Sequence, residues 1–435
     1  MRRFRTPRRC QAPRYDRGQV VASEFFGALT EREFRNLYFA RAFSLFGDGI
    51  APVALAIAIL KTLHWSPSAL GYVLGVRAGA VVAFLLIAGV VADRLPRRVI
   101  LISSDLLRFS AQGATAALIL TKQATLFELM ILAFAYGLGD AFFRPTSTGI
   151  VPQTVTSERL QQAMAMIALT QSSFLVLGPV VAGALAVTVG PGWAIAIDSA
   201  TFLVSAGFVA RLSRLPRAPA GAGFLRELRE GWAVFSGRTW LWVDGVFSAL
   251  GSCAIFAPFL VLGPAVVLYG LHSTGGWAAI IAAFGGGSVV GGFLLLRARP
   301  TRPLVAAVPP LALLALPTGL LAAKAPVAVI AVGAFAGGLG LAVFNTLFET
   351  TVQRAVPPEA LSRVASIDWM LSASLLPLGF AGAGWAAGYI GVRETLAGAA
   401  VWAVVSTAVV LLVPDVRNFR HEPAPTETTL EAEPA

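Results

Sequence analysis

The chain has 435 residues, of which 56% are hydrophobic and 13% are charged, and its formal net charge is +11. This composition excludes a single soluble domain and predicts an all-α membrane protein. We attribute the positive charge to membrane topology and to contact with anionic lipid headgroups, and we expect no nucleic-acid partner.

Twelve apolar segments of the chain are long enough to cross a membrane, since a hydrocarbon layer of ~30 Å needs roughly 20 helical residues. They lie at about 34–61, 68–92, 98–121, 125–149, 160–187, 191–212, 239–268, 275–297, 302–322, 326–351, 361–390 and 393–413. The segments 239–268 and 361–390 exceed the length of a straight crossing, so we expect tilt or a turn outside the membrane in each.

The segments divide the chain into five predicted regions. These are a basic N-terminal tail (1–33), a first six-helix bundle (34–212), a linker (213–238), a second six-helix bundle (239–413) and a disordered C-terminal tail (414–435). Within the linker, residues 224–235 place their apolar side chains on one helical face. This pattern predicts an amphipathic helix at the cytoplasmic surface.

The two halves of the chain repeat each other at a constant offset of 201 residues. Gly-Leu-Gly at 137–139 recurs at 338–340, and Gly178 recurs as Gly379. Such a repeat in an apolar chain is typical of a duplicated transporter, in which two parallel bundles enclose a central site. We therefore predict twelve transmembrane helices in two bundles related by a pseudo-two-fold axis.

Basic residues are unevenly distributed between the loops. Arginine is concentrated in the N-terminal tail and after spans 2, 6, 8 and 10, whereas the opposite loops carry only Lys61, Lys122, Lys324 and Arg393. Because basic loops stay in the cytoplasm, we expect both termini there. The preference for arginine over lysine favours a bacterial source, and hence the cytoplasmic membrane.

The most specific motif of the chain lies between spans 2 and 3. Its pattern is G-x-x-x-D-R-x-x-R-R, formed by Gly89, Asp93, Arg94, Arg97 and Arg98. This motif resembles the signature loop of the major facilitator superfamily. The resemblance implies a charge network that latches the cytoplasmic gate when the carrier faces outward. The alternative is a plain positively charged loop, in which the aspartate has no part.

Span 5 carries a second motif, formed by Gly178, Pro179 and Gly183. It resembles the G-P-x-x-(G/A)-G motif that is associated with antiporting exporters of the superfamily. The glycines narrow the helix, and the proline removes a backbone donor and bends it. A helix that is merely kinked for packing is the alternative.

Span 4 departs from the drug-exporter pattern. The Gly-x-Gly step at 137–139 is present, but no arginine precedes it; instead Asp140 and Arg144 are four residues apart and can pair on one helical face. The proton-coupling mechanism of the drug exporters therefore does not transfer directly. With Gly47 and Asp48 in span 1, the pattern over about residues 34–413 most resembles enterobactin-exporter-like and macrolide-efflux-like carriers.

Ionisable residues inside the membrane are costly and therefore indicate function. The proton-coupling candidates are Asp48, Asp140, Asp368, Asp244 and Asp198. Their possible charge partners are Arg41, Arg77, Arg144, Asp105 and Arg108, of which Asp105 and Arg108 are expected near the membrane interface. An apolar cavity favours a protonated carboxylate, which can bind and release a proton as the carrier changes facing.

Asp48 and Asp140 are preferred, because spans 1 and 4 line the central cavity in the fold that the chain resembles. For each candidate, a structural pair with a nearby arginine is the alternative.

These patterns predict a secondary active transporter that exports an amphipathic drug, siderophore or other secondary metabolite by proton antiport. The alternative on the same fold is an importer of a sugar, peptide or organic acid, although such carriers usually bury more polar groups. A membrane enzyme should gather histidine, cysteine or acidic residues, yet the three histidines are scattered. We expect no catalytic residue, metal or cofactor, and a monomer in contact with membrane lipids.

Overall fold

The computed structural model describes residues 27–213, 224–295 and 300–420, and within these ranges the chain is helical, without strands. The long helices of the first half are α2 (Arg32–Ile57), α3 (Pro67–Arg94), α4 (Arg97–Thr121), α5 (Leu126–Gly149), α6 (Leu160–Thr188) and α7 (Pro191–Val209). The second half contains α9 (Thr239–Gly251), α10 (Ala257–Ala265), α11 (Gly276–Leu294), α12 (Pro303–Ala307), α13 (Ala315–Ala322), α14 (Val327–Ala355), α15 (Pro358–Ser374), α16 (Leu376–Ile390), α17 (Val392–Leu411) and α18 (Pro414–Asn418). Between the halves lies α8 (Phe224–Ser236), so the predicted linker helix is present.

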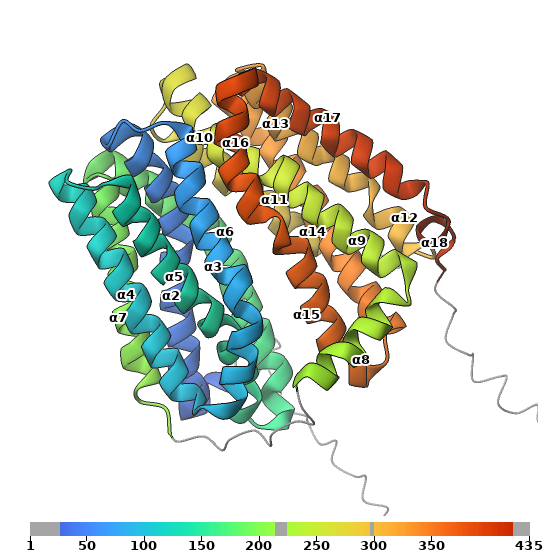
Figure 1. Ribbon diagram of the computed structural model, residues 1–435. Helices are drawn as coiled ribbons and strands as arrows, with labels where there is room; N and C mark the ends of the chain where they lie inside the picture. Colours follow the sequence, from blue (N-terminus) through green and yellow to red (C-terminus); the bar gives the residue numbers. More distant parts are fainter. Residues whose placement is uncertain (1–26, 214–223, 296–299, 421–435) are drawn as a thin grey trace, which may run out of the picture.

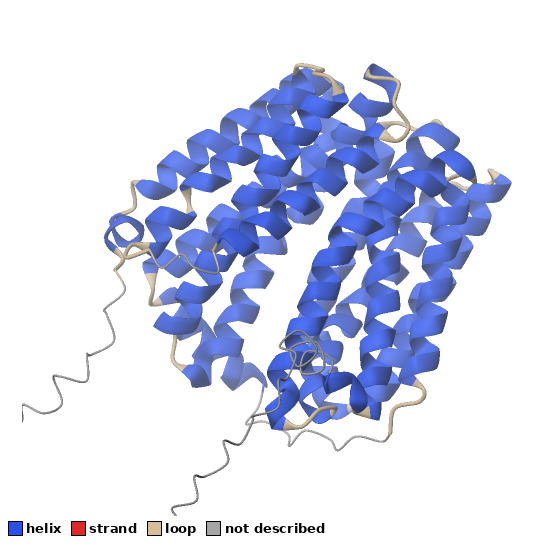
Figure 2. Ribbon diagram, turned by 180° about the vertical axis from the view of Figure 1, so that it is seen from behind, coloured by secondary structure: helices blue, strands red, loops and turns tan. Residues whose placement is uncertain are grey.

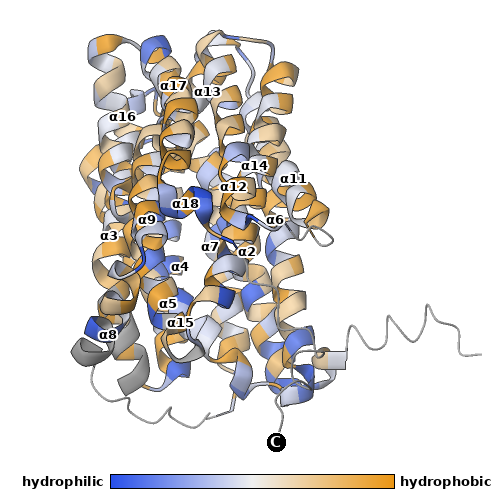
Figure 3. Cartoon of the chain, turned by 90° about the vertical axis from the view of Figure 1, so that its right-hand side faces the viewer, coloured by the Kyte–Doolittle hydropathy of each residue, from blue (hydrophilic) through white to orange (hydrophobic). Residues whose placement is uncertain are grey.

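Eleven stretches of described helix are long and apolar enough to cross a membrane, and α4 completes the twelve predicted spans. α4 is less apolar than the others because it carries Asp105, Arg108 and Gln112 in its middle and two arginines at its start. It packs against α5 and α7, so these polar residues contact protein rather than lipid. Elsewhere hydrophobic residues predominate along the helices (Figure 3), as expected for a multi-pass membrane protein.

The helices form two bundles, α2–α7 and α9–α17, which lie side by side (Figures 1 and 2). We call the end of the molecule where α7 ends and α8 lies the linker end, and the opposite end the far end. The bundles meet through α3 with α16 and α6 with α11, and they diverge toward the linker end (Figure 1). The predicted fold of twelve helices in two bundles is confirmed.

Each of the two overlong spans is interrupted. α15 ends at Ser374 and α16 begins at Leu376, with Pro377 in its first turn. In the other span, a π-helical turn at Ser252–Phe256 (η5) separates α9 from α10. Wide turns of this kind recur at functional sites, and η5 contributes to a cavity described below.

Glycines allow the bundles to approach closely at the far end. A Cβ at Gly183 in α6 would clash with Ala278 in α11, and a Cβ at Gly384 in α16 would clash with Ser68 in α3. The two glycines occupy equivalent positions of the repeat. The same contact is therefore made twice, as a pseudo-two-fold axis requires.

Residues with positive φ give independent evidence of the duplication. Among the described residues they form three pairs at equivalent positions: His64 with His272, Lys122 with Lys324, and Gly190 with Gly391. Each follows the end of an odd-numbered span and begins a short far-end loop. The loops of the two halves thus share their backbone geometry as well as their sequence pattern.

Gly190→Ala is expected to destabilise the protein although space is available for the methyl group. Gly190 has φ 93° and ψ 156°, a region that is essentially restricted to glycine, yet no atom lies within 4 Å of an added Cβ. The expected cost is about 1–3 kcal/mol, measured as a lower unfolding temperature in detergent. Gly207→Ala in α7, which also meets open space, is the control and should be neutral or stabilising. Equal effects of the two substitutions would contradict this prediction.

Candidate functional site

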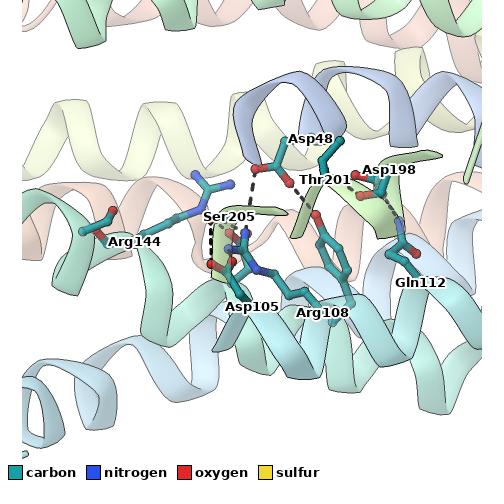
Figure 4. A network of polar contacts seen from close by, with 11 residues as sticks. Asp48, Asp105, Arg108, Gln112, Arg144, Asp198, Thr201 and Ser205 are labelled. Atoms are coloured by element: carbon teal, nitrogen blue, oxygen red, sulfur yellow. Dashed lines mark hydrogen bonds and ion pairs between the residues drawn. The ribbon is translucent and has the colours of Figure 1, made fainter. Parts of the chain in front are cut away.

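A buried arginine organises the interior of the first bundle (Figure 4). The side chains of Arg108 and Asp105, both on α4, are fully buried, and Arg108 Nη2 donates a hydrogen bond to Asp105 Oδ1. The other carboxylate oxygen of Asp105 accepts from Ser205 Oγ of α7 at 2.6 Å. The Arg108 guanidinium lies 4.0 Å and 4.3 Å from the ring centroids of Phe143 and Phe202. Both side chains are thus enclosed by protein, and their location near the membrane interface stays a prediction.

The depth of this pair follows from helix geometry. Asp105 lies eight residues after the start of α4 at Arg97, which places it about 12 Å along the helix at 1.5 Å per residue. There α4 packs against α5 and α7, and both side chains are fully buried. The Asp105–Arg108 pair is therefore compensated internally.

Asp48 on α2 connects this pair with the surface of a cavity. Its carboxylate lies 3.9 Å from Arg108 Nη1 and accepts a hydrogen bond from the Tyr136 hydroxyl. The Arg77 guanidinium lies 4.0 Å from the centroid of the Tyr136 ring. Because the Asp48 side chain is 25% exposed, it is the member of the network that water can reach.

Asp198 on α7 is also fully buried. Gln112 Nε2 donates to its Oδ2, whereas its Oδ1 has no hydrogen-bond partner among the described residues. A Cβ at Gly47 would clash with Asp198 Oδ1, so the glycine leaves the space that this carboxylate occupies. The described part of the chain provides no ion-pair partner for Asp198.

A cavity of about 320 Å³ lies between the two bundles. We call it the central cavity. Its charged residues, Arg77, Asp140 and Arg144, all come from the first bundle. The second bundle contributes an apolar wall of Leu260, Trp277, Ile281, Trp369, Leu376 and Phe380. One wall can thus bind a charged or hydrogen-bonding group while the other covers a hydrophobic body.

Within the central cavity, Asp140 and Arg144 form the predicted intrahelical pair. Arg144 Nε lies 2.9 Å and 3.0 Å from the two carboxylate oxygens of Asp140. The Arg144 side chain is 56% exposed, whereas Asp140 is nearly covered. Loss of the negative charge on Asp140 would leave Arg144 free to turn toward a bound molecule.

A second cavity, of about 390 Å³, lies inside the second bundle. We call it the acidic chamber, because Asp244 of α9, Glu349 of α14 and Asp368 of α15 line it. Trp369 lines both the acidic chamber and the central cavity. The sequence did not single out Trp369, since a tryptophan in an apolar span is most simply read as a packing residue. Its position beside Asp368 was the available indication.

The structure locates only part of the predicted gate motif. The side chains of Gly89, Asp93 and Arg94 lie outside the described residues. Arg97 Nη1 donates to the carbonyl oxygen of Gly149, and Arg98 Nη2 donates to that of Ala210. These arginines therefore satisfy carbonyl groups at the linker ends of α5 and α7.

Arg41 was predicted as a charge partner of a carboxylate, but in the structure it contacts a backbone carbonyl group instead. Its Nη1 atom donates to the carbonyl oxygen of Ser147 at 3.4 Å. No described acidic side chain forms an ion pair with it. Arg41 thus holds the linker end of α5 against α2 through a backbone contact.

The motif of span 5 lies at two helix contacts. Gly178 packs directly on Gly49 of α2, where a Cβ would approach backbone atoms to 2.6 Å. Gly183 makes the far-end contact with Ala278 described above, and Pro179 lies within the continuous helix α6. The small residues thus account for close packing within the first bundle and between the bundles.

Asp105→Asn is expected to destabilise the protein more than Asp48→Asn does. The first change leaves Arg108 buried with only a distant carboxylate, which typically costs about 3–5 kcal/mol. The second removes a partly exposed partner and leaves the Asp105–Arg108 hydrogen bond in place. Thermal unfolding of the purified variants measures both changes. Ser205→Ala, which removes one neutral donor, should cost only about 1 kcal/mol; a larger loss from Asp48→Asn than from Asp105→Asn would refute this assignment.

Comparisons with known proteins agree with this architecture. The family model described as Major Facilitator Superfamily matches residues 37–379. Macrolide efflux protein A of Streptococcus pyogenes is 23% identical over 353 residues, which cover 77% of this chain and 85% of that protein. The enterobactin exporter EntS of Shigella boydii is 30% identical over 198 residues, 44% of this chain and 45% of that exporter.

Solved structures show the same fold. A bacterial homologue of the human lysosomal transporter Spinster, in an inward-facing and occupied conformation, superposes with a TM-score of 0.70 at 18% identity and covers 91% of this chain and 99% of that one. The nucleoside transporter NupG gives a TM-score of 0.69 at 13% identity and covers 89% and 99%. At these identities the likeness establishes the fold alone.

Proposed function

The chain belongs to the Major Facilitator Superfamily, and we propose that this transporter exports amphipathic small molecules by proton antiport. The central cavity carries the proposal, because its charged wall and its apolar, aromatic wall together match a molecule with one polar end. A drug, a siderophore or another secondary metabolite has this character. The names of the similar macrolide and enterobactin exporters support the outward direction.

An importer of a hydrophilic solute is the second candidate, because carriers of nucleosides and peptides share this fold. A sugar or an organic acid presents polar groups on all sides. The apolar wall formed by the second bundle would leave many of those groups without hydrogen bonds. The cavity therefore favours the amphipathic substrate.

Transport would occur by rocking of the two bundles about the central cavity. At the far end, Lys61 Nζ donates to Thr274 Oγ1 at 2.8 Å, and the Tyr269 hydroxyl donates to the carbonyl oxygen of Leu60 at 2.5 Å. Both bonds join the bundles and must break when the far end opens. Because arginine-rich loops favour the cytoplasmic side for the linker end, we assign this conformation as inward-facing.

Tyr269→Phe is expected to shift the carrier toward the conformation that is open at the far end. The change removes one hydrogen bond specific to the closed far end, worth about 0.5–1.5 kcal/mol. The ratio of the two facings should therefore change by about 2- to 12-fold. Spin-label distances between the bundles report this ratio. Tyr389→Phe on the exposed face of α16 is the matched control, and an equal shift in both variants would count against the far-end latch.

We assign proton exchange first to Asp140 and second to Asp48. Protonation of Asp140 would release Arg144 within the central cavity, which couples the proton to the site that holds the substrate. Asp48 would act through Tyr136 and Arg77, since these residues connect its carboxylate with the cavity wall. We further propose a monomer with both tails in the cytoplasm, embedded in the cytoplasmic membrane of a bacterium.

Accumulation of a fluorescent dye in inverted membrane vesicles tests this function. A pH gradient, acid inside, should drive accumulation by the wild type, and collapse of the gradient should release the dye. Asp140→Asn should abolish gradient-driven accumulation and retain exchange of labelled for unlabelled dye. Exchange needs substrate binding and rocking but no proton transfer.

Glu128→Gln is the control for this experiment, since Glu128 is an exposed capping residue of α5 and a glutamine can keep the cap. Its accumulation should match the wild type. If Asp140→Asn and Asp48→Asn, singly and together, accumulate dye as the wild type does, the assignment of the proton to these carboxylates is wrong. Dye movement at the same rate with and without a pH gradient would refute proton antiport.

A further inference from the structure

We propose that the acidic chamber binds the positively charged group of an amphipathic organic cation, whose apolar body lies in an adjoining groove on the outside of the second bundle. This inference rests on the proposed function, because it names a class of substrate for the same carrier. It differs in location from the central cavity, since the lining residues of the acidic chamber all belong to the second bundle.

Polar groups that lack partners point to a ligand in the acidic chamber. Asp244 is only 8% exposed and has no hydrogen-bond or ion-pair partner among the described residues. Ser406, 6% exposed, has an unpaired Oγ, and Oδ1 of Asp368 is buried and also unpaired. All three residues line the cavity. Buried polar groups are normally satisfied, so three such groups in one cavity favour a shared ligand.

The charge of the chamber determines the sign of that partner. Asp244, Glu349 and Asp368 contribute carboxylates, and no lysine, arginine or histidine is among the residues that line the cavity. Carboxylates that share one cavity repel one another when they are charged. A bound cation would relieve this repulsion. An anion would add to it.

The lining favours an organic cation over a metal ion. Within the described residues no group of three acidic, histidine or cysteine side chains is arranged to hold a metal. Aromatic rings form much of the wall instead. Phe344 lies 6.5 Å from Phe247 and 5.6 Å from Phe348, measured between ring centroids. Aromatic faces beside carboxylates are the environment that binds ammonium and related cations.

An apolar groove of about 200 Å³ adjoins the acidic chamber between α9 and α17. Phe247 and Ser406 line both spaces, so the two spaces adjoin at these side chains. The groove opens to the outside of the bundle, where Trp242 is 44% and Val409 is 55% exposed. A molecule with a cationic end and an apolar body matches the chemistry of the two adjoining spaces. The proposed path between the acidic chamber and the central cavity passes Trp369, which lines both.

Equilibrium dialysis of the full-length protein with radiolabelled tetraphenylphosphonium tests the site. Tetraphenylborate has the same shape and the opposite charge, and it serves as the matched probe. The wild type should bind the cation at least tenfold more tightly than the anion. Asp244→Asn and Asp368→Asn should each weaken binding of the cation at least tenfold and leave binding of the anion unchanged or stronger.

Asp415→Asn, an exposed residue of α18, is the control and should bind as the wild type does. Asparagine matches aspartate in shape, so unfolding temperatures at or above the wild-type value will show that the chamber variants are folded. Wild-type affinity in the Asp244→Asn, Asp368→Asn double variant would overturn the proposal. So would displacement of tetraphenylphosphonium by millimolar Na⁺, since the site would then be one for a metal ion.

Binding is measured without a gradient, which separates this proposal from the proposed function. Gradient-driven transport of a neutral dye, with no binding of tetraphenylphosphonium, would refute the acidic chamber as a cation site and leave proton-coupled export intact. Charge-dependent binding that the two variants abolish, without any gradient-driven transport, would confirm the site and refute the export mechanism.

Discussion

The first bundle depends on compensating the positive charge of one arginine far from water. Arg108 lies on α4, the least apolar of the twelve spans. Its neighbours are arranged around that charge: Asp105 binds it, Ser205 holds Asp105, and Phe143 and Phe202 cover the guanidinium. A charge in such surroundings is tolerated only when a partner is fixed beside it. This requirement ties α4 to α7 and, through Asp48, to α2.

The two bundles differ in whether their buried carboxylates have partners. In the first bundle most of the buried carboxylates have an arginine or an amide donor within reach, whereas the three carboxylates of the acidic chamber have no cationic partner among the described residues. The repeat has therefore kept the backbone and changed the chemistry. Asp368 illustrates this divergence, because its counterpart in the first half is Ile167. A duplicated scaffold can in this way combine one bundle whose buried charges are mostly paired with another whose buried carboxylates have no cationic partner among the described residues.

The helices, their pairing into two bundles and the repeat could be predicted from hydropathy, loop charge and glycine spacing. Partners could not. The enclosure of Asp105 between helices and the contact of Arg41 with the backbone of α5 depend on how each helix is rotated about its axis, and apolar spans constrain that rotation weakly. The central cavity was expected from the family resemblance, and its charged residue Asp140 was among the candidates. The acidic chamber was not anticipated, because it requires five helical segments to leave one space between them.

The paired left-handed residues at the far end have a mechanical consequence. Each of the six far-end turns fixes the exit of one helix and the entry of the next within a few residues, so consecutive spans form stiff hairpins that are closed at one end. Their opposite ends are joined only by the linker-end loops and by neighbouring hairpins. We therefore expect each bundle to deform little at the far end and more at the linker end. Under the proposed rocking mechanism, the gate at the far end would open by displacement of whole bundles, and the gate at the linker end would also open by spreading of hairpin tips.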